Sequence, residues 1–140
     1  MNWFIYALLA AFFAALTTIL AKIGIKDVNS NLATAIRAFV ILIFTWAIVW
    51  FQGTFKQIHS ISQFSVIFLI LSGITAGLSW LLYFKALQLG NASQVSPIDK
   101  LSLVITIILA TFILKEKITF SIAIGAVLML AGAALIGFGK

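Results

Sequence analysis

Charged residues are scarce in this chain, yet three of them lie in one short stretch between two long apolar runs. The stretch is YFKALQLGNASQVSPIDKLSL, residues 83–103, and it contains Lys85, Asp99 and Lys100. Charge within a lipid bilayer is costly, so it usually faces a protein interior or a watery cavity. Because two bases accompany a single acid here, the chemistry that this stretch offers is the binding of an anion.

Arg37 adds another base within a different apolar run. The rise of an α-helix places Arg37 roughly 8 Å, and Lys85 roughly 6 Å, from the ends of their runs on one side of the membrane. Lys22 and Lys100 fall near the same level, and Asp99 cannot neutralise all of these bases. We therefore predict a cationic mouth suited to an anionic or carboxylate-bearing solute. The alternative is that each base extends separately to the lipid headgroups.

Two aromatic residues precede Lys85 by less than two helical turns. Trp80 lies well inside its apolar run, and Tyr83 follows about one turn later. We expect them to form an apolar wall beyond the cations, and simple packing is the alternative for Trp80. The predicted substrate-binding residues are Arg37, Trp80, Tyr83, Lys85, Asp99 and Lys100.

Nothing in the sequence favours an enzyme. The chain has no cysteine, which excludes disulfides, thiolate metal sites and cysteine nucleophiles. Its single histidine, His59, lies in an expected loop, and no nucleophile–base pair or metal-ligand spacing is present. We predict no catalytic residue, no cofactor and no metal. The net charge of +6 is scattered between apolar runs, so it does not indicate nucleic-acid binding.

The elements that position these residues are membrane-spanning helices. The chain of 140 residues is 64% hydrophobic and 9% charged, whereas a soluble domain is about half apolar and a quarter charged. Five apolar runs are close to the roughly 20 residues that cross a bilayer. They cover residues 3–21, 32–51, 64–89, 95–114 and 118–138. The runs are continuous and do not alternate, which predicts an all-α bundle rather than a β-barrel, as one domain over residues 1–140.

The start of the fourth run is ambiguous. Ser96, Pro97 and Asp99 fit the N-cap, first and third positions of a helix, where a carboxylate meets free N–H groups. A start at Ser93 would instead place Pro97 just inside the helix.

Loop charge gives little guidance on orientation. Five spans place the termini on opposite sides, with three bases on the N-terminal side and six on the other. Without Arg37, Lys85 and Lys100, which lie within apolar runs, the count is three against three. A balanced count permits insertion in both orientations, and a single weakly specified orientation is the alternative.

Small residues mark where helices can pack closely. The third run contains Gly73 and Gly77, and the fifth places Gly125, Gly132 and Gly139 on one face. These faces predict contacts either within one bundle or with a second subunit.

The segment ALQLGNASQVSP (residues 86–97), the turn at Glu116, and Gly125 with Gly132 resemble the EamA domain of the drug/metabolite transporter superfamily. The resemblance extends over essentially the whole chain. This sequence departs from the usual pattern at two positions: Lys115 replaces the glycine before the glutamate, and Leu103 stands where many members have a second proline.

The resemblance implies a function. Members mostly contain two such domains in inverted orientation, with ten helices in all, and export or exchange small metabolites across the inner membrane. This chain resembles one half, which implies a homodimer, in an antiparallel or a parallel arrangement, acting as a secondary transporter in a bacterial or archaeal inner membrane. An accessory subunit of a larger transporter and a purely structural membrane protein are the alternatives. The related small multidrug-resistance proteins use a glutamate in their first helix, and no acid is present there in this chain.

Overall fold

The computed structural model describes residues 2–138, and these residues form helices and turns without a β-strand. Five helical stretches are long and apolar enough to cross a membrane, which confirms the predicted all-α membrane protein. They are α1 (Trp3–Gly24), α2 (Ser30–Phe51), α3 (Gln63–Leu89), α4 (Ala92–Asp99) joined to α5 (Leu101–Ile113), and α6 (Phe120–Phe138). Most large apolar side chains are exposed on the single chain, as expected of a protein solvated by lipid.

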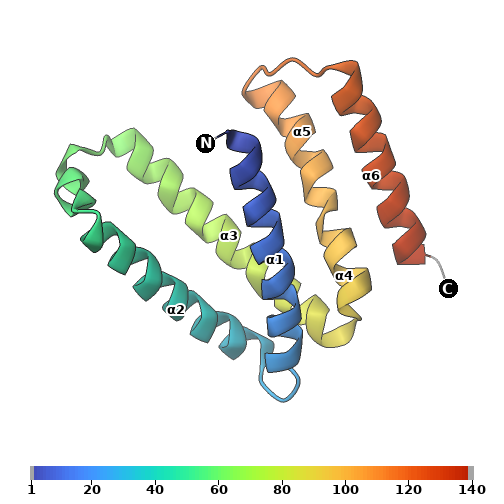
Figure 1. The fold of residues 1–140 in the computed structure, drawn as a ribbon, viewed down its shortest axis with the longest axis horizontal. Coiled ribbons are helices and arrows are strands. Elements are labelled where there is room, and N and C mark those ends of the chain that lie inside the picture. Colours follow the sequence, from blue (N-terminus) through green and yellow to red (C-terminus); the bar gives the residue numbers. More distant parts are fainter. Residues whose placement is uncertain (1, 139–140) are drawn as a thin grey trace. The chain divides into compact units, whose positions relative to one another are not determined.

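The chain divides into two compact units. Unit 1 consists of residues 1–20 and 89–140, and it contains most of α1 together with α4, α5 and α6. Unit 2 consists of residues 21–88 and contains α2 and α3. Each unit includes a pair of antiparallel helical segments, α2 with α3 in unit 2 and α4–α5 with α6 in unit 1 (Figure 1).

The α2–α3 hairpin of unit 2 has clear start and stop signals. The side chain of Asn29 caps α2 by accepting the backbone N–H groups of Asn31 and Leu32, at 2.9 and 3.4 Å. After α2, Gly53 adopts a left-handed φ of 67°, which favours glycine. A short 3₁₀-helix, η1 (Thr54–Ser60), follows inside the segment that the sequence suggested was a plain loop.

The start of the fourth span corrects the favoured interpretation of the sequence. Ser96 is not an N-cap, because α4 begins four residues earlier and Asn91, in an extended conformation, precedes it. Asn91 O already accepts the N–H groups of Gln94 and Val95, at 3.0 and 2.9 Å. Pro97 therefore lies inside α4, close to the alternative that placed the helix start at Ser93.

Pro97 is followed by a break in this span. A proline inside a helix lacks a donor and clashes with the carbonyl four residues earlier. The helix is interrupted three residues later at Lys100 and continues as α5. The Lys100 carbonyl accepts the Leu103 N–H at 3.0 Å, a tighter three-residue bond. Asp99 is thus the last residue of α4, not the third residue of a helix.

Unit 1 packs α6 against both α4 and α5. A Cβ built at Gly137 would lie 3.3 Å from Ile98 Cδ1, a tight contact between α6 and α4 that a small shift of the Ile98 side chain would relieve. Lys115, in the turn between α5 and α6, has a φ of 57°. This is the position at which the resembling family usually has glycine, and the left-handed backbone gives the physical reason. Gly139 lies outside the described residues.

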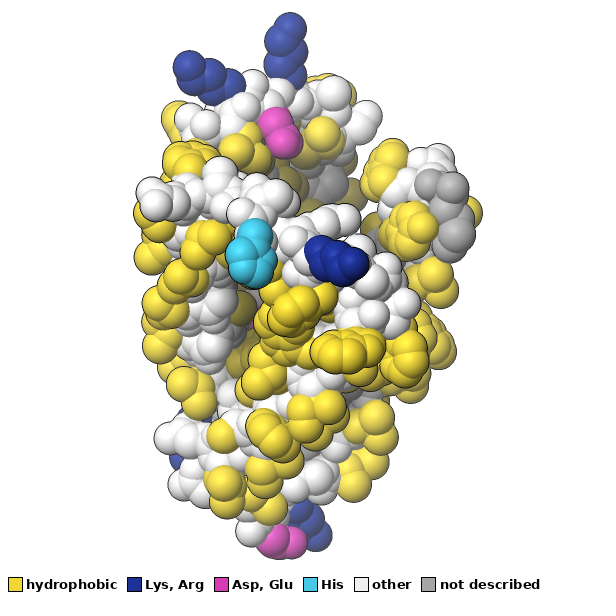
Figure 2. Space-filling view, turned by 90° about the vertical axis from the view of Figure 1, so that its left-hand side faces the viewer, with side chains coloured by type: hydrophobic (Ala, Val, Ile, Leu, Met, Phe, Trp, Pro, Cys, Tyr) yellow, Lys and Arg dark blue, Asp and Glu magenta, His cyan; other side chains and the backbone are white. Residues whose placement is uncertain are grey.

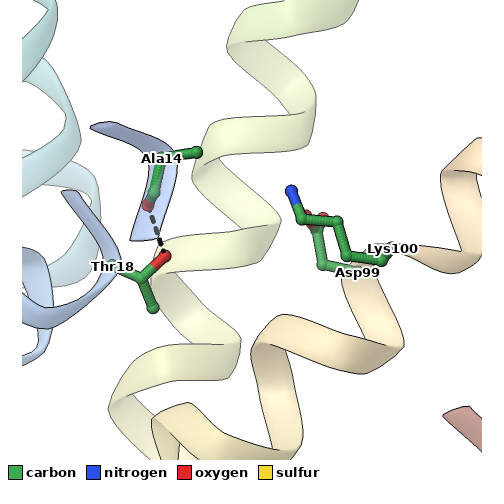
Figure 3. Close-up of polar contacts among 4 residues, drawn as sticks. All are labelled: Ala14, Thr18, Asp99 and Lys100. Carbon is green, nitrogen blue, oxygen red and sulfur yellow. Dashed lines mark hydrogen bonds and ion pairs between the residues drawn. The ribbon is translucent and has the colours of Figure 1, made fainter. Parts of the chain in front are cut away.

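Hydroxyl groups in the spans bond to their own helices, because lipid offers no partner. The Thr18 hydroxyl donates to Ala14 O at 3.1 Å (Figure 3), and the Thr34 hydroxyl donates to Ser30 O at 2.8 Å. Among the described residues, no buried side-chain nitrogen or oxygen lacks a hydrogen-bond partner.

Candidate functional site

Arg37 and two aromatic rings form the most distinctive polar arrangement in unit 2. The guanidinium carbon of Arg37, on α2, lies 4.7 Å from the ring centroid of Trp80 and 5.4 Å from that of Phe84, both on α3. Trp80 and Phe84 are four residues apart, so they lie one above the other on one helix face. Both rings are within the range of a cation–π interaction, which is worth about 2 kcal/mol or more where water is excluded.

Arg37 lies well inside its span. It is the eighth residue of α2, which places it about 10 Å along the axis from the helix start. Its side chain is half-buried. The one acidic residue of unit 2 is Asp27, which is exposed in the turn before α2. The aromatic rings therefore hold the charge of Arg37 without neutralising it, and a guanidinium in that state can still donate in its own plane to a carboxylate.

The other predicted residues of α3 differ in their surroundings. Tyr83 is half-buried. Lys85 is exposed and points about 100° around the helix from Phe84, which is buried. Within residues 2–138, Lys85 has neither an ion pair nor a hydrogen bond from its side chain. Its place beside Arg37 in a cationic cluster remains a prediction.

Lys22 joins the last turn of α1 to the end of α3, and Gln88 joins the end of α3 to the turn between α1 and α2. Lys22 Nζ donates to the carbonyl oxygen of Leu87 in the last turn of α3, where a cation is stabilised by the helix dipole. Gln88 Nε2 donates to Val28 O at 2.7 Å and to Ile25 O at 3.4 Å. Lys22 therefore has a structural partner, although the sequence placed it at the same depth as the other bases.

Asp99 and Lys100 belong to unit 1 and pair with each other. The carboxylate oxygen of Asp99 lies 3.8 Å from Lys100 Nζ, and the two side chains are 36% and 52% exposed (Figure 3). They stand at the break between α4 and α5. The acid thus offsets the charge of its neighbour, and the predicted grouping of this pair with Arg37 remains a prediction.

The sequence analysis did not identify Phe84 as a member of the site, although the sequence contains a signal for it. Phe84 follows Trp80 by four residues, which is the spacing of one helix face, but it was not considered beside Arg37. Within the described residues 2–138, no group of three or more His, Cys, Asp or Glu side chains could hold a metal ion.

The fold and these side chains define a multi-pass helical membrane protein with an unneutralised cation inside one span. The chain belongs to the EamA-like transporter family, which it matches over residues 1–138. It is 44% identical over 135 residues to a Sinorhizobium sp. protein named "Uncharacterized transporter in cobO 3'region", and the match covers 96% of each chain. No solved structure matches the chain. Family and relative both indicate transport, a role other than catalysis.

Proposed function

We propose that the protein is a secondary transporter that exports or exchanges a small anionic or carboxylate-bearing metabolite across a bacterial or archaeal plasma membrane. The observation that carries this proposal is Arg37, a guanidinium inside α2 that is held by Trp80 and Phe84. A stacked guanidinium of this kind is well suited to a planar anion, because its remaining N–H groups match two carboxylate oxygens. Lys85 and Lys100 would add positive potential at the mouth, and Tyr83 would extend its apolar wall. Neither enzymatic chemistry nor a cofactor is part of the proposal.

The proposed working form is a homodimer in which a second copy supplies the other half of an inverted repeat. The relative from Sinorhizobium sp. is matched over 96% of its own length, so a transporter-named protein of this length also has one such domain. Open glycines are compatible with a second copy. A Cβ built at Gly73, Gly77, Gly125 or Gly132 meets no atom within 4 Å, which leaves room for another helix.

The transport proposal is tested with the purified protein in lipid vesicles. Vesicles loaded with a panel of carboxylates are expected to take up radiolabelled carboxylate by exchange, while a panel of lipophilic cations is not moved. Lys85→Met is expected to weaken transport because it removes charge at the mouth and keeps most of the side-chain volume. Lys26→Met removes equal charge from the exposed turn after α1 and serves as the control. Equal transport by both variants would show that Lys85 only extends to the headgroups.

The antiparallel arrangement needs its own experiment. Three lysines added to residues 52–63 should fix one orientation, because basic loops stay in the cytoplasm. Transport is then expected to fall, and to recover when a copy biased the other way is co-expressed. Full activity of the fixed form alone would contradict an antiparallel dimer. It would not contradict the proposed carboxylate site.

A further inference from the structure

The short helix η1 carries three different faces in seven residues. A 3₁₀-helix has about three residues per turn, so side chains three apart lie on one face. One face is basic (Lys56, His59), one is polar (Gln57, Ser60), and one is apolar (Phe55 and Ile58). Figure 2 shows the histidine, in cyan, with hydrophobic side chains next to it. Such a segment is suited to the boundary between headgroups and acyl chains.

Aromatic contacts hold η1 at that boundary. The ring centroid of Phe55 lies 5.8 Å from that of Trp46 and 6.3 Å from that of Trp50, both near the end of α2. Tryptophan is enriched at the level of the headgroups. Because η1 connects the spanning helices α2 and α3, it must lie at the membrane surface.

A cavity of about 350 Å³ opens between the end of α2 and η1. That volume lies in the range of small-molecule sites, roughly 300–1,000 Å³. All of its lining residues belong to unit 2, and the cavity does not include Arg37. The lining is Thr45, Trp46, Val49, Thr54, Gln57, Ile58, Ser60 and Ile61.

All three hydroxyls that line this cavity are already engaged. Thr45 donates to Ile41 O at 2.8 Å, and Thr54 donates to Val49 O at 3.3 Å. Ser60 donates to Gln57 O at 2.7 Å. The helix wall is therefore largely apolar.

Among the described residues, the side-chain amide of Gln57 has no hydrogen-bond partner. It remains as a donor at the mouth of the cavity, one residue from the exposed ammonium of Lys56. The cavity thus combines an apolar wall with one free donor, and Lys56, which does not line it, is the neighbour of that donor along η1.

We propose that this cavity binds an anionic phospholipid, with an acyl chain along Trp46 and Val49 and the phosphate at Gln57 and Lys56. A lipid matches the site better than a solute from water for two reasons. The cavity lies at the depth where headgroups meet chains, and its free donor, Gln57, is on η1 whereas Trp46 and Val49 are on α2. The site is separate from Arg37, so the proposal does not depend on the transported substrate.

The test is native mass spectrometry of the full chain released from vesicles of equal parts phosphatidylglycerol and phosphatidylcholine. The parent protein is expected to retain one phosphatidylglycerol per chain in preference to phosphatidylcholine. Lys56→Gln is expected to lower that preference about fivefold, from roughly 1 kcal/mol per basic residue at an anionic surface. Val49→Phe, which places a ring in the cavity, is expected to abolish retention of either lipid.

Matched controls keep the result interpretable. Lys115→Gln removes a charge from the turn between α5 and α6, and Val66→Phe adds a ring to the exposed surface of α3; both are expected to retain the lipid. Three results would each overturn the proposal. The first is equal retention by Lys56→Gln and its control, and the second is equal retention by Val49→Phe and its control. The third is displacement of the lipid by excess free glycerol phosphate.

Discussion

The α2–α3 hairpin and the α4–α6 segment each carry a base within a span, in very different surroundings. Arg37 in unit 2 lies against Trp80 and Phe84, and the only acid of its unit is exposed in a turn. Lys100 in unit 1 stands beside its sequence neighbour Asp99, at 3.8 Å, and is 52% exposed. One base is held by ring faces and keeps its charge available, whereas the other is partly offset and open.

The difference shows that the depth of a charge does not by itself reveal its role. The sequence placed Lys22, Arg37 and Lys100 at a similar level, but each has a different partner: a helix carbonyl, two aromatic rings, and a carboxylate. An exposed ion pair contributes little to stability, since its median measured contribution is about 0–1 kcal/mol. Arg37 lies over two rings with no acid beside it in its unit, so its charge stays available to an anion. Unit 2 is therefore the part in which we expect the strongest effect on the substrate.

The largest expected effect is at Arg37. Arg37→Gln is expected to weaken carboxylate binding by roughly 30-fold or more, because losing one partner of a desolvated charge pair costs about 2–5 kcal/mol. Arg37→Lys keeps the charge but not the planar fork, so it is expected to restore only a small part of the affinity. Titration calorimetry with the purified protein gives the dissociation constants.

Lys100→Gln is the matched variant in unit 1, and it is expected to change the affinity only about threefold or less, since an exposed, already paired charge contributes little. Equal losses in Arg37→Gln and Lys100→Gln would break the comparison between the two units. Full rescue by Arg37→Lys would show that charge alone, without planarity, recognises the substrate.

A smaller effect concerns the turn of unit 1. Lys115→Gly is expected to raise the free energy of unfolding by about 0.5–1 kcal/mol. Glycine removes the cost of a side chain in the left-handed region, about 1–2 kcal/mol, but part of this gain is offset because glycine loses more backbone entropy on folding. Lys117→Gly is the control, since Lys115 is the one non-glycine residue with positive φ in the described chain. Thermal unfolding of the two variants in the same detergent compares them, and equal stabilisation by both would contradict the left-handed backbone as the cause.

The smallest effect is expected at Asp99. Asp99→Asn removes the carboxylate of an exposed pair and should change stability by at most about 0.5 kcal/mol. The same variant is expected to strengthen anion binding slightly, because Lys100 is then no longer offset. A loss of stability of several kcal/mol would mean that the pair is buried in the working protein.

The number and type of the elements followed from the sequence alone. Hydrophobicity adds up along a chain, and a run of about 20 apolar residues spans a bilayer whatever packs against it. All five predicted spans are therefore helices in the structure. Helix ends were less certain: the sequence offered starts at Ser96 and at Ser93, and the backbone bonds of Asn91 showed that α4 begins slightly before both. Similarly, η1 is too short to be recognised from periodicity.

Only the tertiary structure decided which side chains meet. Lys22 and Leu87, which share a hydrogen bond, are 65 residues apart, and the contact of Arg37 with Trp80 likewise joins two different helices. Such contacts depend on how each helix is rotated and on which turns lie side by side. In α3 nearly every face is apolar, so its sequence does not mark an inner side. The sequence could thus indicate that Arg37 lies within a membrane span, but the ring faces that hold it became visible only once α2 and α3 were packed.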